Sequence, residues 1–141
     1  MTTLAFDGKI LAADTLVTAD GMAFGHAKKI FKLKDGRYFA FCGSFALELA
    51  IIEWLNGGEV PSILDQEGLG GIVVDPKTGK AFEFNRSFRL YPACIPWAGG
   101  SGEQIAMTAM KCGKTAVQAV KVACSLDIHS REPINSVRIR Q

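Results

Sequence analysis

Residues 2–14 read TTLAFDGKILAAD, and within this stretch the pair Asp7-Gly8 separates two largely apolar runs. An Asp-Gly pair between apolar runs is a strong signal for a β-hairpin with a two-residue turn. The sequence therefore predicts that residues 2–6 and 9–14 form antiparallel strands at the start of the chain.

Two further pairs of apolar runs are each separated by a turn signal: residues 29–33 and 37–42 around Asp35-Gly36, and residues 71–74 and 80–84 around residues 76–79. Residues 134–140 form a last predicted strand. Three hairpins in one chain indicate a fold with substantial antiparallel sheet.

Three stretches of the sequence are typical of helices. Ser44 can cap a helix over residues 45–55, which ends at Asn56-Gly57-Gly58. Because this stretch is apolar nearly all round, we expect the helix to be largely buried. Residues 103–111 and 115–124 have apolar positions at helical spacing and form two more predicted helices.

The order of these elements is strands, helix, strands, helices and a final strand. No fixed-period repeat, low-complexity run or Pro-rich linker divides the sequence, so residues 1–141 are expected to form one domain. The order predicts an α+β fold in which sheets are sandwiched between helices.

The composition narrows the class of protein. The chain has 141 residues, 48% of them hydrophobic, and 16 Lys and Arg against 14 Asp and Glu give a net charge of +2, which is no nucleic-acid signature. Its 4 cysteines lack a C-x-x-C spacing, and we expect them to be reduced thiols.

Without a signal peptide or a long apolar run, the expected location is cytoplasmic, with no membrane insertion. The 2 isolated histidines suggest no metal site, and no cofactor is implied.

Thr2 is the first candidate for catalysis. It follows Met1, and a threonine is small enough for the initiator methionine to be removed, which would leave Thr2 at the true N-terminus. Its hydroxyl could then act as a nucleophile with its own α-amine as general base, since that amine has an ordinary pKa of about 7.7–8.0. The alternative is that Thr2 simply begins a β-strand.

Lys29 is the second candidate, because it shares one face of its predicted strand with Phe31 and Leu33. A lysine among core residues needs a carboxylate partner, and Asp14, at the end of the first hairpin, is available. The alternative is that Lys28 and Lys29 form a solvated entrance to the strand.

One glycine and three polar residues are further candidates for the site. Gly43 could direct a backbone N–H at a developing oxyanion, although an ordinary strand-to-helix turn would also use glycine. Ser101 lies in a glycine-rich turn, where it is the expected N-cap of the helix over residues 103–111. Asp127 and Ser130 could form a polar pair, although the polarity of a loop alone would place such residues there.

Taken in order, these motifs resemble the β-type proteasome subunits and the bacterial peptidase HslV: Thr2-Thr3, Ala13-Asp14, Lys28-Lys29-Ile30, Cys42-Gly43-Ser44, Gly100-Ser101-Gly102 and Asp127-Ile128-His129-Ser130. The resemblance implies the four-layer αββα sandwich of the N-terminal-nucleophile hydrolases. Residues 56–68 offer only a short connection where that family has a second long helix. One helical layer is therefore expected to be reduced.

The resemblance also implies a function, that of a threonine-type peptidase. Thr2 would be the nucleophile, Lys29 would tune its amine and hydroxyl, and Asp14 would hold the lysine. Gly43 would be the oxyanion donor. The residues that would surround the amino terminus are Ser101, Asp127 and Ser130.

The implied assembly is a homo-oligomeric ring, stacked as a double ring, that receives peptides or unfolded proteins from an ATP-dependent unfoldase. Because the reduced layer lies where the family's unfoldase docks, a standard HslU-type partner is expected to bind poorly. Two alternatives stay open: a catalytically silent shell protein that retains Met1, and a small-amide hydrolase of the same superfamily.

Overall fold

The computed structural model describes residues 2–19, 21–62 and 68–139. A four-stranded antiparallel sheet has the order β10-β1-β2-β11. Its strands are β1 (Thr3–Phe6), β2 (Ile10–Ala13), β10 (Trp97–Gly100) and β11 (Asn135–Arg138).

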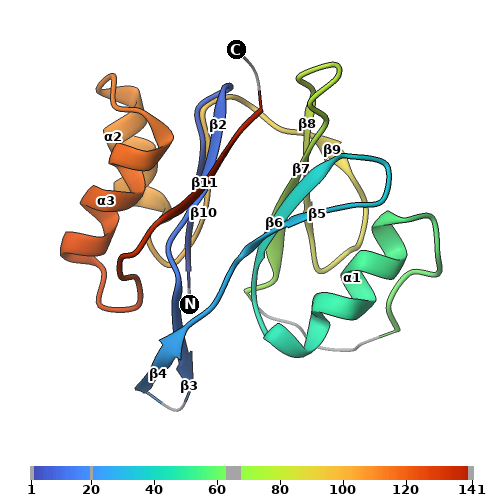
Figure 1. Ribbon diagram of the computed structural model, residues 1–141, viewed down its shortest axis with the longest axis horizontal. Coiled ribbons are helices and arrows are strands. Elements are labelled where there is room, and N and C mark those ends of the chain that lie inside the picture. The colour runs from blue at the N-terminus through green and yellow to red at the C-terminus, as the bar shows by residue number, and fades with distance from the viewer. Residues whose placement is uncertain (1, 20, 63–67, 140–141) are drawn as a thin grey trace.

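A five-stranded antiparallel sheet has the order β5-β6-β7-β8-β9. Its strands are β5 (Ile30–Lys32), β6 (Tyr38–Cys42), β7 (Gly70–Val74), β8 (Ala81–Asn85) and β9 (Tyr91–Pro92). The two sheets lie beside each other in the centre of the molecule, with helices on the outside (Figure 1).

Strand alternation explains how the first sheet buries both faces. Leu4 and Phe6 of β1 belong to the core between the two sheets, whereas Ala5 belongs to the core under α2 (Glu103–Lys111) and α3 (Ala116–Leu126). The helix-facing core is rich in alanine, and small side chains let helices approach a sheet closely. Both sides of β1 are therefore fully buried.

Among the described residues, one helix, α1 (Glu48–Leu55), covers the outer face of the second sheet. Phe39, Phe41 and Phe84 of the sheet pack with Ile51 and Leu55 of the helix. Helices and antiparallel sheets thus occur together, and the predicted α+β class is confirmed. No helix among the described residues is long and apolar enough to cross a membrane.

The predicted hairpins are present, with one change at the first turn. Phe6 pairs with Leu11 and the N–H of Asp7 bonds to Ile10, so the two turn residues are Gly8 and Lys9. The predicted turn at Asp7-Gly8 is therefore wrong by one residue. The physical reason is the Asp7 carboxylate, whose Oδ1 accepts hydrogen bonds at 2.8 Å from the N–H groups of both Lys9 and Ile10.

The predicted helices are also present, but the expected burial of the first is wrong. Ser44 caps a short 3-10 turn, Phe45–Leu47, and α1 begins after it. Within α1 only Ile51 and Leu55 are buried, and Leu49 is 75% exposed. A single helix on an open sheet buries one stripe of its surface, so an apolar sequence does not ensure that the opposite side is covered.

Four strands of the structure, β3 (Leu16–Ala19), β4 (Met22–His26), β9 and β10, are not predicted from the sequence. The ribbon of β3 and β4 extends away from the two sheets (Figure 1). The last strand is shorter than expected, and Arg140, at the end of the predicted range, lies outside the described residues.

Candidate active site

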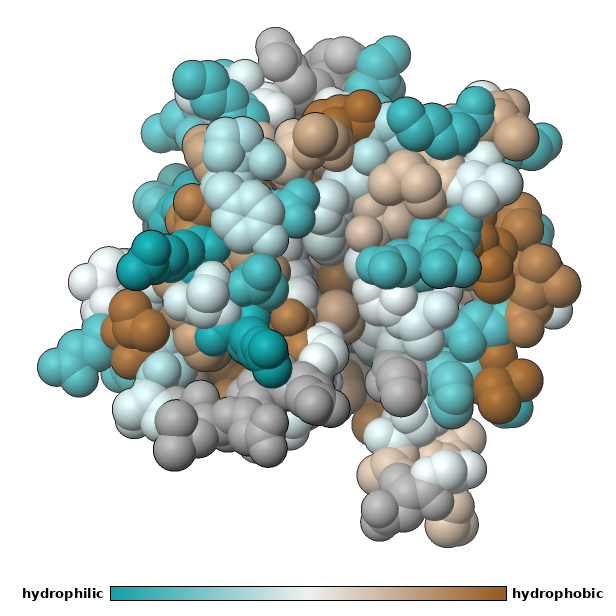
Figure 2. Space-filling model, turned by 180° about the vertical axis from the view of Figure 1, so that it is seen from behind, coloured by the Kyte–Doolittle hydropathy of each residue, from teal (hydrophilic) through white to brown (hydrophobic). Residues whose placement is uncertain are grey.

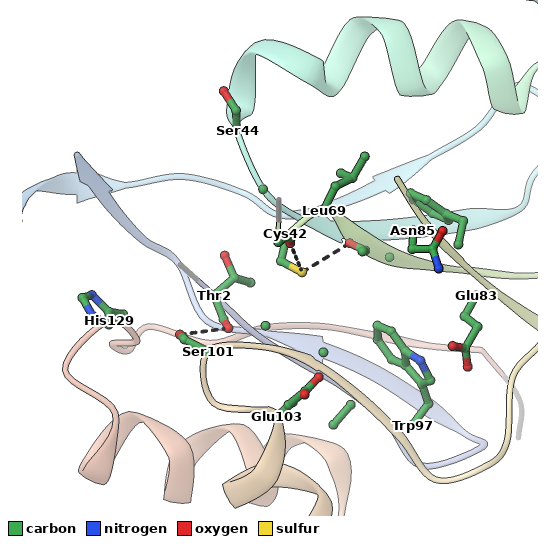
Figure 3. A pocket seen from close by; sticks show the side chains of 18 of the residues that line it. Thr2, Cys42, Ser44, Leu69, Glu83, Asn85, Trp97, Ser101, Glu103 and His129 are labelled. Atoms are coloured by element: carbon green, nitrogen blue, oxygen red, sulfur yellow. Dashed lines mark hydrogen bonds between the residues drawn. The ribbon is translucent and has the colours of Figure 1, made fainter. Parts of the chain in front are cut away.

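Thr2 lies immediately before β1, at the wall of a cavity of about 770 Å³. Only 5% of its surface is exposed. Gly43 follows β6 and Ser101 follows β10, and both residues line the same cavity (Figure 3). The cavity therefore joins the ends of strands from both sheets.

Two glycines let the turn after β10 approach the start of β1. Gly100 has φ +91°, and a Cβ built on it would collide with the carbonyl of Thr2. A Cβ on Gly102 would collide with Oγ1 of Thr3. Glycine is therefore required at position 100 by the backbone of Thr2 and at position 102 by the side chain of Thr3.

A buried ion pair lies behind the N-terminal strand. The Nζ of Lys29 is 2.8 Å from Oδ1 of Asp14, and the side chains are 2% and 0% exposed. The same Oδ1 accepts the N–H of Thr3 at 3.0 Å. Oδ2 accepts the N–H groups of Leu16 and Arg131, each at 3.2 Å. The predicted pairing of Lys29 with Asp14 is confirmed, and the solvated-entrance alternative is wrong for Lys29.

Lys29 is buried as predicted, but not for the predicted reason, which is strand alternation. Lys29 precedes β5 rather than lying within it, so strand alternation with Phe31 and Leu33 does not direct its side chain. Burial lowers the pKa of Lys29, and the charge and hydrogen bond of Asp14 oppose this effect without cancelling it. The lysine consequently gives up its proton more readily than an exposed one.

A second polar group lies between α3 and the turn after β10. Oδ2 of Asp127 accepts hydrogen bonds from the hydroxyls of Ser101 at 2.6 Å and Ser130 at 2.7 Å. Oδ1 accepts the N–H of His129 at 3.2 Å. Desolvation acts to raise the pKa of Asp127, but these hydrogen bonds outweigh it and hold the pKa below its ordinary value.

Ser101 does not cap α2 as expected; its hydroxyl is bonded to Asp127 instead. The N-cap of α2 is Gly102, with no side-chain cap hydrogen bond, so the predicted N-cap at Ser101 is wrong. The Ser101 hydroxyl is bonded to Asp127 and lies 3.3 Å from the carbonyl oxygen of Thr2. A charged acceptor 2.6 Å away holds a hydroxyl more strongly than a helix N–H would.

Gly43 and Cys42 form the opposite wall of the cavity. Gly43 has φ +138°, and a Cβ there would lie 3.2 Å from Cδ1 of Leu69. The thiol of Cys42 donates to the carbonyl of Gly70 at 3.3 Å, and burial raises its pKa. Since the thiolate is the nucleophilic form, Cys42 is poorly suited to act as a nucleophile at neutral pH.

The structure thus gathers the candidate residues around the start of β1. Thr2, Gly43 and Ser101 line the cavity, whereas Asp14, Lys29 and Ser130 are buried beside it. Residues of the site that received no role from the sequence are Thr3, Cys42, Glu103 and His129. Strand alternation places Thr3 on the face opposite Leu4 and Phe6, but it identifies neither the burial of Thr3 nor the partners of its hydroxyl.

The solved structures that are similar to this chain include three that match over nearly its whole length. Thiobacillus denitrificans BPH has a TM-score of 0.73 at 20% identity, covering 96% of this chain and 95% of the other. The same protein in complex with epoxomicin has a TM-score of 0.75 at 20% identity, covering 97% of each chain. Eukaryotic HslV from Trypanosoma brucei has a TM-score of 0.74 at 19% identity, covering 96% of this chain and 97% of the other.

Comparisons of the sequence give no such relatives. No family model matches the sequence, and no curated protein matches it. At 19–20% identity the structural likeness establishes the fold alone. The resemblance to HslV expected from the sequence is confirmed at this level, and the chain has the fold of HslV and of Thiobacillus denitrificans BPH.

Proposed function

We propose that this chain is a threonine-type peptidase in which Thr2 becomes the N-terminal nucleophile when Met1 is removed. The observation that carries the proposal is the buried Lys29–Asp14 pair, hydrogen-bonded to the residue that follows Thr2, in a fold shared with HslV. Residues 1–141 would form one domain, an αββα sandwich of the N-terminal-nucleophile hydrolases with α1 as its reduced helical layer. Met1 itself lies outside the described residues.

In the first step, the neutral α-amine of Thr2 takes the hydroxyl proton through a water molecule. Oγ1 then attacks the carbonyl carbon of the scissile peptide bond, and the carbonyl oxygen becomes an oxyanion. The N–H of Gly43, which lines the same cavity, would donate to this oxyanion. The C–N bond breaks, the proton passes to the leaving amine, and an ester remains on Thr2.

In the second step, a water molecule attacks the ester, with the α-amine again accepting a proton. The carboxylic acid product leaves and the hydroxyl of Thr2 is restored. The buried cation of Lys29 would lower the pKa of the α-amine, which keeps this base neutral near pH 7. Asp14 would orient the lysine. The carboxylate of Asp127, with Ser101 and Ser130, would orient the amine and its water.

The proposal extends to assembly and partners. The peptidase would form a homo-oligomeric ring, or two stacked rings, in the cytoplasm and cleave peptides or unfolded proteins supplied by an ATP-dependent unfoldase. HslV and Thiobacillus denitrificans BPH support this only through their fold.

Mass spectrometry and an inhibitor test the proposal together. The mature N-terminus is sequenced first, and the purified protein is then incubated with epoxomicin, which is bound by one of the similar structures. We expect an N-terminal Thr2 and a covalent adduct on it. A Thr2→Ala protein is the control for adducts elsewhere.

The alternatives give different results in the same experiment. Retention of Met1 with no adduct would support a catalytically silent shell protein. A free Thr2 that hydrolyses small amides but no peptide would support the small-amide hydrolase. Either result would reject the peptidase.

A further inference from the structure

The backbone groups and the side-chain hydroxyl of Thr3 all have hydrogen-bond partners. Its side chain is fully buried. Its N–H donates to the carboxylate of Asp14 at 3.0 Å, and its carbonyl accepts the N–H of Asp14 at 3.1 Å. Its hydroxyl lies 2.7 Å from the hydroxyl of Ser130. Every polar group of the residue after Thr2 is therefore held.

The directions of these hydrogen bonds follow from the number of hydrogens. Ser130 donates its single hydroxyl hydrogen to Asp127, so the hydroxyl of Thr3 must be the donor to Ser130. The result is a chain from Thr3 through Ser130 to the carboxylate of Asp127, which also holds Ser101. Thr3 is thus bonded to both polar groups of the site, the Lys29–Asp14 pair on one side and the Asp127 group on the other.

We propose that Thr3 is a positioning residue whose hydroxyl couples the Asp127 group to the N-terminal strand and so fixes Thr2 for attack. The inference rests on the proposed function. Through its backbone Thr3 is fixed to Asp14, and through its side chain to Ser130, so Thr2 has few directions in which to move. A reacting group misplaced by about 1 Å can lose roughly 100-fold in rate.

The surroundings of Thr3 favour this role over simple packing. A valine has nearly the same shape and a similar preference for strands, so the hydroxyl is not needed to fill the space. Burying a hydroxyl is costly unless it is hydrogen-bonded, and the partner here is a residue of the site. The glycine at position 102 leaves the space that Oγ1 of Thr3 occupies.

Three variants test the inference in the full-length protein. Thr3→Val removes the hydroxyl and keeps the shape, and Thr3→Ser restores a hydroxyl. Thr15→Val is the matched control, because Thr15 is also buried and its hydroxyl bonds to His26 at 2.9 Å and to the Pro133 carbonyl at 2.7 Å, outside this network.

The first measurement is the rate of peptide hydrolysis. We expect the kcat of Thr3→Val to fall roughly 10- to 100-fold with little change in KM, and Thr3→Ser to recover most of the loss. Thr15→Val should keep its kcat, whatever it loses in Tm. An equal kcat in the two valine variants would overturn the inference.

The second measurement does not depend on catalysis. The carboxyl of Asp127 is titrated by ¹³C NMR, with His129, its neighbour, followed in the same spectra. We expect Thr3→Val to raise the pKa of Asp127 toward its ordinary value, because Ser130 becomes a weaker donor without the bond from Thr3. A titration identical to that of the wild type would show that Thr3 is not coupled to Asp127, and would overturn the inference.

The two measurements separate the inference from the proposed function. A wild-type protein with a free Thr2 that hydrolyses no peptide would reject the peptidase, and the titration alone would then decide whether Thr3 couples the two groups. An active wild type whose Thr3→Val variant keeps both kcat and titration would reject only the role of Thr3.

Discussion

At the scale of single residues, Thr2 carries the proposed chemistry. Thr2→Ala should abolish peptide hydrolysis, because it removes the nucleophilic hydroxyl. The fold should survive, because the contacts of Thr2 are made by its backbone carbonyl, which an alanine keeps: it accepts the N–H of Gly102 at 3.5 Å and lies 3.3 Å from the hydroxyl of Ser101. Peptidase assays and thermal unfolding of the same preparation measure both effects. Retention of most of the activity would falsify the threonine mechanism.

Lys29 should contribute to both activity and stability. Lys29→Ala leaves the buried carboxylate of Asp14 without its cation, which should cost about 3–5 kcal/mol in the free energy of unfolding and inactivate the enzyme. Urea unfolding measures the loss. The control is Asp35→Asn, which removes the exposed partner of Arg37 and should change stability little. A Lys29→Ala protein as stable as the wild type would contradict the argument from the buried pair.

Asp127 gives a dependence of stability on pH. The pKa of Asp127 lies below its ordinary value of 3.8, so in acid the unfolded state binds a proton before the folded state does. The contribution of the Asp127 carboxylate to the free energy of unfolding is therefore present above pH 3.8, and it is lost as the pH falls through the pKa of the folded state. The difference in unfolding free energy between wild type and Asp127→Asn should therefore shrink in acid. A difference that stays constant from pH 6 to pH 2 would contradict this.

The sequence predicts the partner of a site residue more readily when the two residues are close together in the chain. A lysine among core residues needs a carboxylate, and that requirement correctly pairs Lys29 with Asp14, although Lys29 precedes β5 and is not placed in the core by strand alternation. The hydroxyl of Thr3, by contrast, meets a residue 127 positions away in the sequence. For the same reason, local rules assign Ser101 to the cap of the helix beside it and do not identify its partner Asp127.

At the scale of elements, the approach of β10 to β1 sets the position of Thr2. Gly100→Ala should lower both stability and kcat, because the new Cβ would collide with the carbonyl of Thr2 and displace it. Gly113→Ala is the matched control, since φ is +91° at Gly100 and +93° at Gly113, where no atom lies within 4 Å of the added Cβ.

The control separates backbone strain from the collision. Gly113→Ala should cost only the strain of a positive φ, about 1–2 kcal/mol, and leave kcat unchanged. Gly100→Ala should lose more than this in thermal or urea unfolding. Equal losses in the two variants, with both active, would show that the approach of Gly100 to Thr2 is not tight.

Elements with their own local signals could be predicted, and the others could not. Turn signals and the spacing of apolar residues lie within the segments that they organise, so they indicate three hairpins and three helices. β10 contains Gly99 and Gly100, which are poor strand formers, and it is held in the sheet by pairing with β1. The exposure of Leu49 on α1 depends on what lies outside the helix, which no pattern within it reveals.

At the scale of the whole molecule, the order of layers follows from alternation in each strand. A strand buried on both faces needs a sheet on one side and helices on the other, as β1 has. The sequence indicates sheets between helices, but not which helix covers which sheet. Which helix covers which sheet depends on how β10 and β11 pair with the first hairpin. β10 pairs with β1 and β11 pairs with β2, and each pair joins segments that are far apart in the sequence.

Apolar surface remains on the outer helices. Leu49 is 75% exposed on α1, and Leu126 and Ile128 are 68% and 78% exposed at and after the end of α3. The view from behind shows apolar side chains on the side of the molecule where α2 and α3 lie (Figure 2). Exposed apolar surface of this kind often marks contact with another subunit.

We therefore expect a homo-oligomer, with a closed ring as the form that the proposed function requires. Among the described residues after α1, 56–62 and 68 form no helix that could cover its outer side, so a neighbouring subunit is the expected cover. A head-to-tail contact closes into a ring only when its rotation divides the circle, and a discrete mass is then expected.

Mass photometry at micromolar concentration measures the mass of the assembly. Leu49→Glu should shift it toward the monomer, whereas Val60→Glu, at a residue that is 57% exposed and lies outside the helix, should shift it less. A wild-type protein that is a stable monomer would overturn the ring and, with it, the compartmentalised form of the peptidase.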